Sequence, residues 1–287
     1  MADVSENLKF AAEILRANGI SAPRREAVSL LVFALGKDQT FLVAHDDYKL
    51  SEAEEIRFQN FLWRRARREP LQYIRGAQEF YGLDFVVTPD VLIPRPETEL
   101  IVENAVEILK NVENPRFCEV GAGSGCISIS ILHEIKTALA TGLDISENAL
   151  QVARKNAENN NVSERLELRF SDIFQTLRRD ETFDLIVSNP PYISPEDLET
   201  LQAEVRLFEP RAALTDGGDG FSIIEKIILD APNFLRGGGY LLMEIGFQQA
   251  RKVSEMFDKN IWQSLELLPD LQGIARTVKA RAVNRQS

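Results

Sequence analysis

RFCEVGAGSG, residues 116–125, joins a short apolar segment to a turn that carries glycine at every second position. The apolar segment predicts a buried strand, and residues 126–135 directly after the turn have the pattern of a helix. Glycines let the backbone of such a turn approach a ligand closely, and the first turn of the helix offers free N–H groups. A strand, this turn and a helix in that order predict a ligand site in an α/β fold.

The spacing of the glycines narrows the class of ligand that this turn is expected to bind. It is Gly-x-Gly-x-Gly, whereas dinucleotide sites carry Gly-x-Gly-x-x-Gly, and a lone glycine-rich turn occurs in both dinucleotide and mononucleotide sites. Glu119 stands two residues before the first glycine. A carboxylate at that position favours a cationic or amine-bearing ligand over a pyrophosphate.

Two further predicted strands lead into acidic residues. Residues 138–143 are followed by Asp144, whose side chain we expect to hold a ribose diol. Residues 166–170 are followed, after Ser171, by Asp172 and Ile173. We expect Asp172 to accept a hydrogen bond from an adenine amino group and Ile173 to pack on the adenine ring.

The segment Asn189-Pro190-Pro191-Tyr192 follows another apolar run, residues 183–187. Consecutive prolines neither continue a central strand nor open a helix smoothly, so a rigid exit from the strand is predicted. Asn189 Oδ1 and the Pro190 carbonyl are acceptors that can take the two N–H bonds of a planar NH2 group, and Tyr192 can stack on its face. The alternative is an ordinary Pro-Pro turn with a capping asparagine.

Together these motifs resemble S-adenosylmethionine-dependent methyltransferases that act on amino groups. Further stretches resemble, more narrowly, the peptide chain release factor glutamine methyltransferases: EPLQYIRG (69–76), LIPRPETE (92–99), EPRAAL (209–214) and GGDG (217–220). The similarity runs in order from about residue 69 onward and more loosely through the preceding helical part. The chain departs from the pattern at Glu119, where aspartate is commoner, and at Ile173, where some members carry an aromatic residue.

The resemblance implies an enzyme with a Rossmann-like, seven-stranded class I methyltransferase domain. It implies methyl transfer from S-adenosyl-L-methionine to the side-chain amide nitrogen of the glutamine in the Gly-Gly-Gln motif of class I peptide chain release factors, with S-adenosyl-L-homocysteine as product. Such direct transfer needs an aligned acceptor nitrogen and no metal. The alternatives are a ribosomal protein glutamine methyltransferase, a DNA adenine amino methyltransferase and a noncatalytic binding module that kept the fold.

The expected site residues form overlapping groups. Those expected to act in catalysis are Asn189, Pro190 and Tyr192, and the same three with Pro191 are expected to bind the substrate amide. Those expected to bind the cofactor are Glu119, Gly121, Ala122, Gly123, Ser124, Gly125, Asp144, Asp172, Ile173 and Asn189.

Composition excludes several other functions. With 287 residues and 44% hydrophobic content the chain can fill a core, and its net charge of −11 argues against nonspecific or direct DNA binding. The two cysteines, Cys118 and Cys126, and the two histidines, His45 and His133, leave no plausible zinc set. The basic run at 64–68 is expected to be a solvated helix face. No signal peptide and no apolar run of about 18 residues is present, so we expect a soluble cytoplasmic protein without membrane contact.

The pattern of predicted elements divides the chain. Residues 1–75 are expected to form an N-terminal helical substrate-recognition domain, and residues 76–94 a β-hairpin linker. Residues 95–287 alternate helices and strands and are expected to form the methyltransferase domain around a mainly parallel sheet. The resemblance to these methyltransferases implies that its last two strands, 261–268 and 274–283, pair antiparallel.

Overall fold

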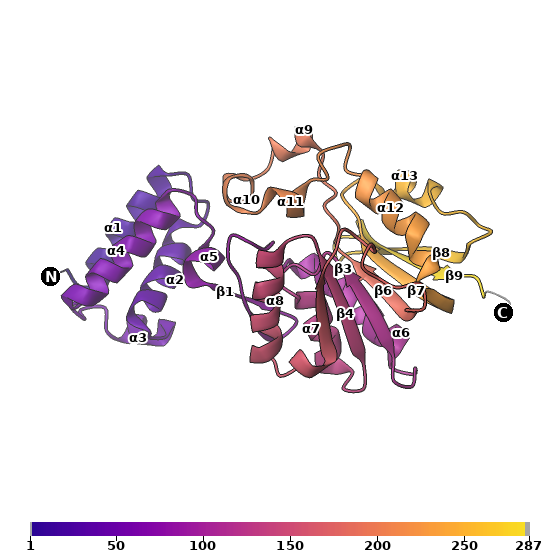
Figure 1. Cartoon of the computed structure of the whole chain (residues 1–287). Helices are drawn as coiled ribbons and strands as arrows, with labels where there is room; N and C mark the ends of the chain where they lie inside the picture. The colour runs from indigo at the N-terminus through magenta and orange to yellow at the C-terminus, as the bar shows by residue number, and fades with distance from the viewer. Residues whose placement is uncertain (1, 285–287) are drawn as a thin grey trace. The chain divides into compact units, whose positions relative to one another are not determined.

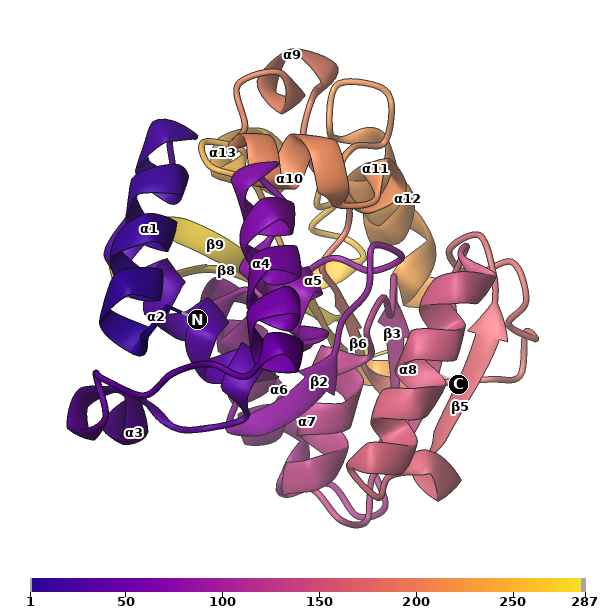
Figure 2. The same cartoon turned by 90° about the vertical axis from the view of Figure 1, so that its left-hand side faces the viewer.

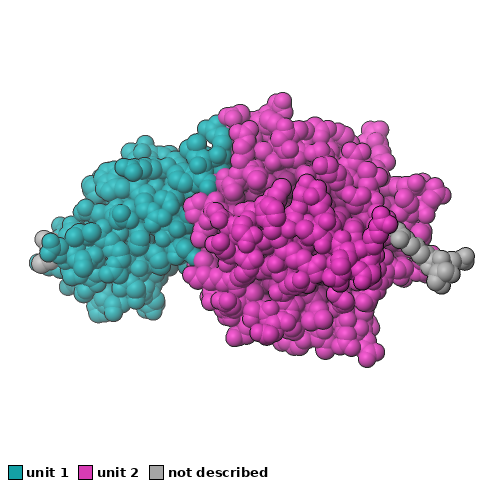
Figure 3. All heavy atoms as spheres, viewed as in Figure 1, with its two compact units in different colours: residues 1–76, 202–208 teal, residues 77–201, 209–287 magenta. Residues whose placement is uncertain are grey.

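The structure is a computed structural model that describes residues 2–284. The chain forms two compact units, one of Met1–Gly76 with Gln202–Phe208 and one of Ala77–Leu201 with Glu209–Ser287 (Figure 3). Residues 202–208 therefore belong to the first unit, although they lie within the range 95–287 that was expected to form the methyltransferase domain. None of the helices in residues 2–284 combines the length and apolar character that crossing a membrane requires.

The first unit is built from helices. Their bounds are α1 (Val4–Ala17), α2 (Pro23–Leu35), α3 (Gln39–Ala44), α4 (Glu52–Ala66), α5 (Leu71–Arg75) and α10 (Ala203–Phe208). Helices α1, α2 and α4 pack side by side (Figure 2). Helix α4 begins at a capping box, in which Ser51 and Glu54 each bond the other's backbone N–H. The fully buried side chains between the helices include Leu15, Leu30, Leu31, Phe58 and Leu62.

The basic run 64–68 differs from the expected solvated face. Arg65 is buried, where it pairs with Glu26 and, at 2.9 Å, with Glu204 of α10. Arg68 also lies 3.2 Å from Glu204. A buried guanidinium needs such partners because leaving its charge unpaired away from water is costly. These arginines therefore hold α10 within the first unit and are not available as a charged patch.

The second unit starts with the predicted hairpin, β1 (Ala77–Phe80) and β2 (Leu83–Val86), paired antiparallel. Tyr81 and Gly82 connect the two strands, with φ of 52° and 72°. Positive φ at both positions of a two-residue loop is the geometry that matches the twist of a hairpin.

A seven-stranded sheet forms the centre of the second unit (Figure 1). Its strands lie in the order β5-β4-β3-β6-β7-β9-β8. Its strands are β3 (Arg116–Val120), β4 (Leu139–Asp144), β5 (Leu166–Phe170), β6 (Phe183–Ser188), β7 (Leu235–Glu244), β8 (Trp262–Pro269) and β9 (Ala275–Ala282). The first five in that order are parallel, and β9 runs antiparallel to both β7 and β8. The predicted fold class and the antiparallel final pair are confirmed.

Helices cover both faces of this sheet. Helices α6 (Glu99–Leu109), α7 (Cys126–Glu134) and α8 (Glu147–Asn159) pack with the hairpin on one face. Helices α12 (Ser222–Asp230) and α13 (Ala250–Glu255) pack on the other. The sequence order of the strands reverses between β3 and β6, so the loops after these two strands diverge. In open α/β sheets, ligands bind at the carboxyl ends of the strands at such a point.

Candidate active site

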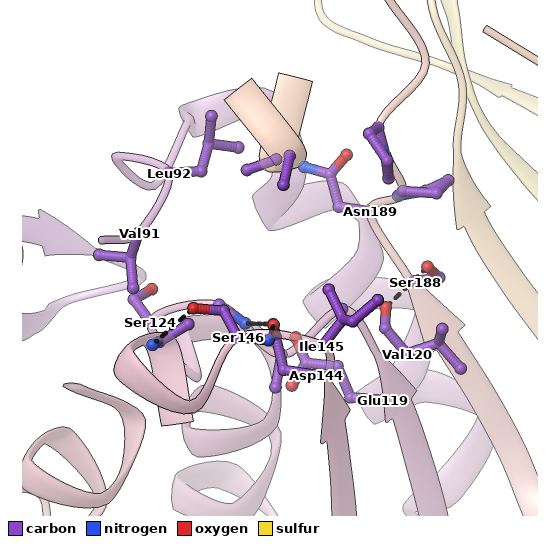
Figure 4. Close-up of a pocket in the computed structure, with 18 of the residues that line it drawn as sticks. Val91, Leu92, Glu119, Val120, Ser124, Asp144, Ile145, Ser146, Ser188 and Asn189 are labelled. Carbon is purple, nitrogen blue, oxygen red and sulfur yellow. Dashed lines mark hydrogen bonds between the residues drawn. The ribbon is translucent and has the colours of Figure 1, made fainter. Parts of the chain in front are cut away.

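A cavity of about 330 Å³ lies at the carboxyl ends of β3, β4 and β6 (Figure 4). Its size falls at the lower end of the range of small-molecule sites, roughly 300–1,000 Å³. Asp144 and Ser146 lie on one side of the cavity, and Leu92 and Asn189 lie on the other. Of the predicted site residues, those that line it are Glu119, Gly121, Ala122, Gly123, Ser124, Asp144, Asp172, Ile173, Asn189, Pro190 and Pro191.

The glycine turn is held by the neighbouring strand. The N–H groups of Gly121 and Ala122 donate to the Leu143 carbonyl at 2.8 and 3.0 Å. Gly121 has a φ of 77°, which glycine adopts without strain. Gly125 has a different role from the one expected, because it does not line the cavity. A Cβ there would lie 3.0 Å from Ile129 Cδ1, so Gly125 allows close packing of helices instead.

Asp144, the last residue of β4, connects the turn to the next helix. Its carboxylate accepts from the N–H of Gly123 at 2.7 Å and from that of Ser146 at 2.8 Å. Burial raises the pKa of Asp144, and these backbone hydrogen bonds oppose the rise. Two bonds leave lone pairs free on both oxygens, so the carboxylate can still accept from a ligand hydroxyl.

Glu119 is buried beneath the turn. Its carboxylate accepts from the Ser128 N–H at 3.0 Å, in the first turn of α7. Burial raises the pKa of Glu119 to about 8, and the charge of Asp144 adds to the rise. Burial therefore favours the uncharged acid form of Glu119 in the free protein. A cationic ligand group beside it would favour the ionised form.

Apolar side chains and one carboxylate form the wall after β4 and β5. Ile145 is more than half exposed at the cavity, and Ile173 lines it with a φ of 49°. A β-branched residue rarely adopts positive φ, so the loop holds Ile173 in place against a backbone cost. Asp172 accepts from Gln175 Nε2 at 3.2 Å. Ile145 was not among the predicted site residues.

The Asn-Pro-Pro-Tyr segment is anchored by two residues that the sequence analysis missed. Asn189 Nδ2 donates to Thr98 Oγ1 at 3.2 Å, and Thr98 Oγ1 donates to Glu244 Oε2 at 2.7 Å. The Tyr192 hydroxyl donates to Glu244 Oε1 at 3.1 Å. Tyr192 itself is not part of the cavity lining. Glu244 carries the same sequence signal as Asp144, an acidic residue at the end of an apolar strand.

Glu209 ties together two stretches that the sequence analysis singled out separately. Its buried side chain forms an ion pair with Arg95 and accepts from the Ile93 N–H at 3.3 Å. The LIPRPETE stretch and the EPRAAL stretch therefore meet at this carboxylate. Arg95 and Pro210 both line the cavity, so the ion pair shapes its wall.

Two family comparisons cover most of the chain. Residues 6–76 match the PrmC N-terminal domain family, and residues 98–223 match the methyltransferase small domain family. A protein of Geobacter sulfurreducens named release factor glutamine methyltransferase is 43% identical over 93% of this chain and 92% of its own length. One of Koribacter versatilis with the same name is 39% identical over 93% of this chain and 94% of its own length.

The chain belongs to the release factor glutamine methyltransferase family. The family expected from the sequence is thus confirmed. The fold agrees with a solved methyltransferase of Pyrococcus furiosus, which has 21% identity and a TM-score of 0.53 over 77% of this chain and 98% of the other. Among residues 2–284, no group of three or more His, Cys, Asp or Glu side chains is placed to hold a metal ion.

A buried asparagine, also missed from the sequence, supports the glycine turn of this family member from behind. Asn156 of α8 donates from Nδ2 to the carbonyls of Ser124 at 2.9 Å and Val86 at 3.0 Å. Its Oδ1 accepts from the Val86 N–H at 2.7 Å. One side chain therefore joins the turn to the hairpin strand β2. The sequence offers no signal for it, because an asparagine in a helix is usually exposed.

Proposed function

We propose that this chain transfers a methyl group from S-adenosyl-L-methionine to the side-chain amide nitrogen of the glutamine in the Gly-Gly-Gln motif of class I release factors, in the cytoplasm. The observation that carries the proposal is the orientation of the Asn189 side-chain amide. Its NH2 group is bound to Thr98, which leaves Oδ1 as the end of the amide that accepts. An acceptor beside a proline carbonyl suits a substrate NH2 group, and relatives alike over nearly their whole length bear the name of this activity.

The residues around the cavity fit S-adenosyl-L-methionine. Asp144 would accept from the ribose hydroxyls, and Asp172 from the adenine amino group. Ile145 and Ile173 offer apolar surface for the adenine ring. Glu119 would face the cationic part of the molecule, where its ionised form becomes favourable. Gly121, Ala122, Gly123 and Ser124 would line the space beside it.

When bound, S-adenosyl-L-methionine supplies a methyl group already activated by a positively charged sulfur, so we propose no role for a metal. The remaining requirement is to hold an amide nitrogen whose lone pair is delocalised into its carbonyl. Asn189 Oδ1 and the Pro190 carbonyl accept the two N–H bonds of the substrate amide and stabilise them as positive charge develops. Once the nitrogen carries the methyl group, it loses one of these two protons to water. Pro191 keeps this loop rigid. Tyr192 does not line the cavity, so its proposed role, packing against the amide plane and excluding water, applies to a substrate glutamine that lies beyond that cavity. Preorganised acceptors of this kind act through positioning and electrostatics.

Asparagine variants test the catalytic assignment. Asn189→Ala should reduce methyl transfer by roughly 10²–10³, the scale of losing one positioned polar group, with little change in cofactor affinity. Asn189→Asp retains an acceptor oxygen, so it should keep more activity than Asn189→Ala. Methylation of the release factor glutamine is measured by mass spectrometry of the Gly-Gly-Gln peptide. Parent rates in both variants would reduce Asn189 to a turn residue.

We further propose that residues 1–75 recognise the protein substrate, with residues 76–94 as linker and residues 95–287 as methyltransferase domain. The support is that these helices, together with residues 202–208, form one compact unit and match a family separate from the methyltransferase small domain. A protein starting at Ala77 should bind the cofactor and methylate a short Gly-Gly-Gln peptide as the parent does, yet methylate intact release factor poorly. Equal activity of the fragment and the full chain on intact release factor would contradict this assignment.

A further inference from the structure

A hydrogen-bonded chain runs behind the proposed acceptor site. Asn189 Nδ2 lies 3.2 Å from Thr98 Oγ1, which in turn lies 2.7 Å from Glu244 Oε2. Thr98 and Glu244 are almost fully buried, so water does not compete for these bonds. The other carboxylate oxygen of Glu244 accepts from the Tyr192 hydroxyl at 3.1 Å. A single carboxylate thus holds two of the proposed catalytic residues.

The direction of each hydrogen in this chain follows from the chemistry of Glu244. An ionised carboxylate only accepts hydrogen bonds, so the one hydroxyl hydrogen of Thr98 points to Glu244. Thr98 Oγ1 then has only lone pairs to offer Asn189, and only the NH2 end of an amide can donate to them. The Asn189 oxygen is consequently turned away from Thr98. A flipped amide would place two oxygens against each other and leave the NH2 group facing the substrate.

We propose that Thr98 and Glu244 are positioning residues that fix the Asn189 amide with its oxygen as the exposed acceptor, and thereby select substrates that present an NH2 group. This inference rests on the role proposed for Asn189. With the amide flipped, the site would offer a donor, which suits a hydroxyl or carbonyl oxygen. The side chain of Asn189 alone has no such preference, because its two ends have nearly the same shape.

The surroundings of Glu244 are consistent with this role. Burial raises the pKa of Glu244, and the charge of Glu97 adds to the rise. Hydrogen bonds from Thr98 and Tyr192 and the charge of Arg276 lower it. One hydroxyl donates to each oxygen of Glu244. These two bonds oppose the rise because they stabilise the ionised carboxylate, which is the form that only accepts.

Three variants and a matched control test the proposal in the full-length protein. Thr98→Val keeps the shape of the side chain but removes the hydroxyl, and Thr98→Ser restores the hydroxyl. Glu244→Gln keeps the shape but adds a donor, which frees the Thr98 hydrogen to point at Asn189. The control is Thr277→Val on the neighbouring strand β9, because the Thr277 hydroxyl is also buried and has no hydrogen-bond partner in the described residues.

We expect Thr98→Val and Glu244→Gln to lower kcat on release factor by roughly tenfold to a hundredfold, somewhat less than the loss of a catalytic group outright. Cofactor affinity measured by calorimetry should stay within about twofold, because the bonds of Asp144 and Glu119 are untouched and Asn189 is only one of the expected cofactor contacts. Thr98→Ser should recover most of the rate, and Thr277→Val should match the parent. Parent rates in both Thr98→Val and Glu244→Gln would overturn the proposal, as would equal losses in Thr98→Ser and Thr98→Val.

A second measurement does not depend on catalysis. In protein labelled with 15N-asparagine, the Asn189 side-chain signals are identified by their loss in Asn189→Ala. Their hydrogen exchange should be slow in the parent and in Thr98→Ser, and fast in Thr98→Val. If the parent does not methylate release factor, the proposed function fails while this measurement still decides the amide direction. Equally fast exchange in the parent and Thr98→Val would overturn the inference even if the enzyme is active.

Discussion

A substitution at Gly220 tests how the loop after the Asn-Pro-Pro-Tyr segment positions Tyr192. A Cβ atom at Gly220 would lie 2.3 Å from the Tyr192 backbone oxygen and 2.9 Å from its carbonyl carbon. Gly217, three residues earlier, has nearly the same φ, 78° against 79°, but no atom within 4 Å of its would-be Cβ. Gly217→Ala therefore introduces the same backbone strain as Gly220→Ala without the collision.

The size of the effect follows from these distances. Real Cβ contacts do not fall below 3.0 Å, so Gly220→Ala must move the Tyr192 backbone oxygen or its own loop by at least 0.7 Å. Gln249 Nε2 also donates to this oxygen at 3.0 Å, so a shift of the oxygen disturbs a supporting bond. Because a misplacement of about 1 Å can cost 10²-fold in rate, we expect kcat to fall roughly tenfold to a hundredfold. Both alanine variants should lose about 1–2 kcal/mol of stability from the left-handed backbone.

The assay compares single-turnover methyl transfer to release factor by the parent and the two variants, with cofactor affinity from calorimetry and stability from urea unfolding. Gly220 does not line the cavity, so cofactor affinity should hardly change. Gly217→Ala should transfer methyl groups at nearly the parent rate despite its lower stability. Equal rates in Gly217→Ala and Gly220→Ala would refute the argument that contact with Tyr192, and not backbone strain, decides the outcome.

Three further predictions concern the cofactor side. Asp144→Ala should weaken S-adenosyl-L-methionine binding by about tenfold to a hundredfold, from the loss of charge-assisted hydrogen bonds; calorimetry showing parent affinity in a folded variant would exclude Asp144 from the site. Folding raises the pKa of Glu119 from 4.5 to about 8, so between these pH values the folded state keeps a proton that the unfolded state has lost. The free energy of unfolding should therefore fall as the pH rises through this range, by up to about 1.4 kcal/mol per pH unit. Urea unfolding from pH 5 to 9 should show a flatter dependence for Glu119→Gln, and an unchanged slope would contradict the assignment. Asn156→Ala leaves buried backbone groups of the turn and hairpin without partners, so it should cost roughly 2–4 kcal/mol in unfolding free energy and weaken cofactor binding; a loss below about 1 kcal/mol would show that other groups replace those bonds.

Local sequence patterns were sufficient to predict most strands and motifs of the second unit. The strand before the glycine turn, the acidic residue ending β4 and the Asn-Pro-Pro-Tyr exit from β6 depend on short-range rules of periodicity, glycine and proline. Parallel strands bring their carboxyl ends to one edge, so these motifs meet in one cavity as a consequence of the α/β order. The antiparallel end of the sheet followed from the family resemblance.

Tertiary structure decided which polar groups meet. Thr98 and Glu244 are 146 positions apart in the sequence, yet they share a 2.7 Å hydrogen bond. No periodicity links Thr98, just before α6, to the end of the distant strand β7. Glu204 pairs with Arg65 and Arg68, which lie far from it in the sequence. Its place in the first unit therefore could not be predicted from the sequence either. The sequence by itself determined the fold class and supplied the proposed acceptor and cofactor motifs, because each depends on neighbouring residues. Only the folded chain determined how buried donors and acceptors are satisfied, because their partners are chosen by packing across elements.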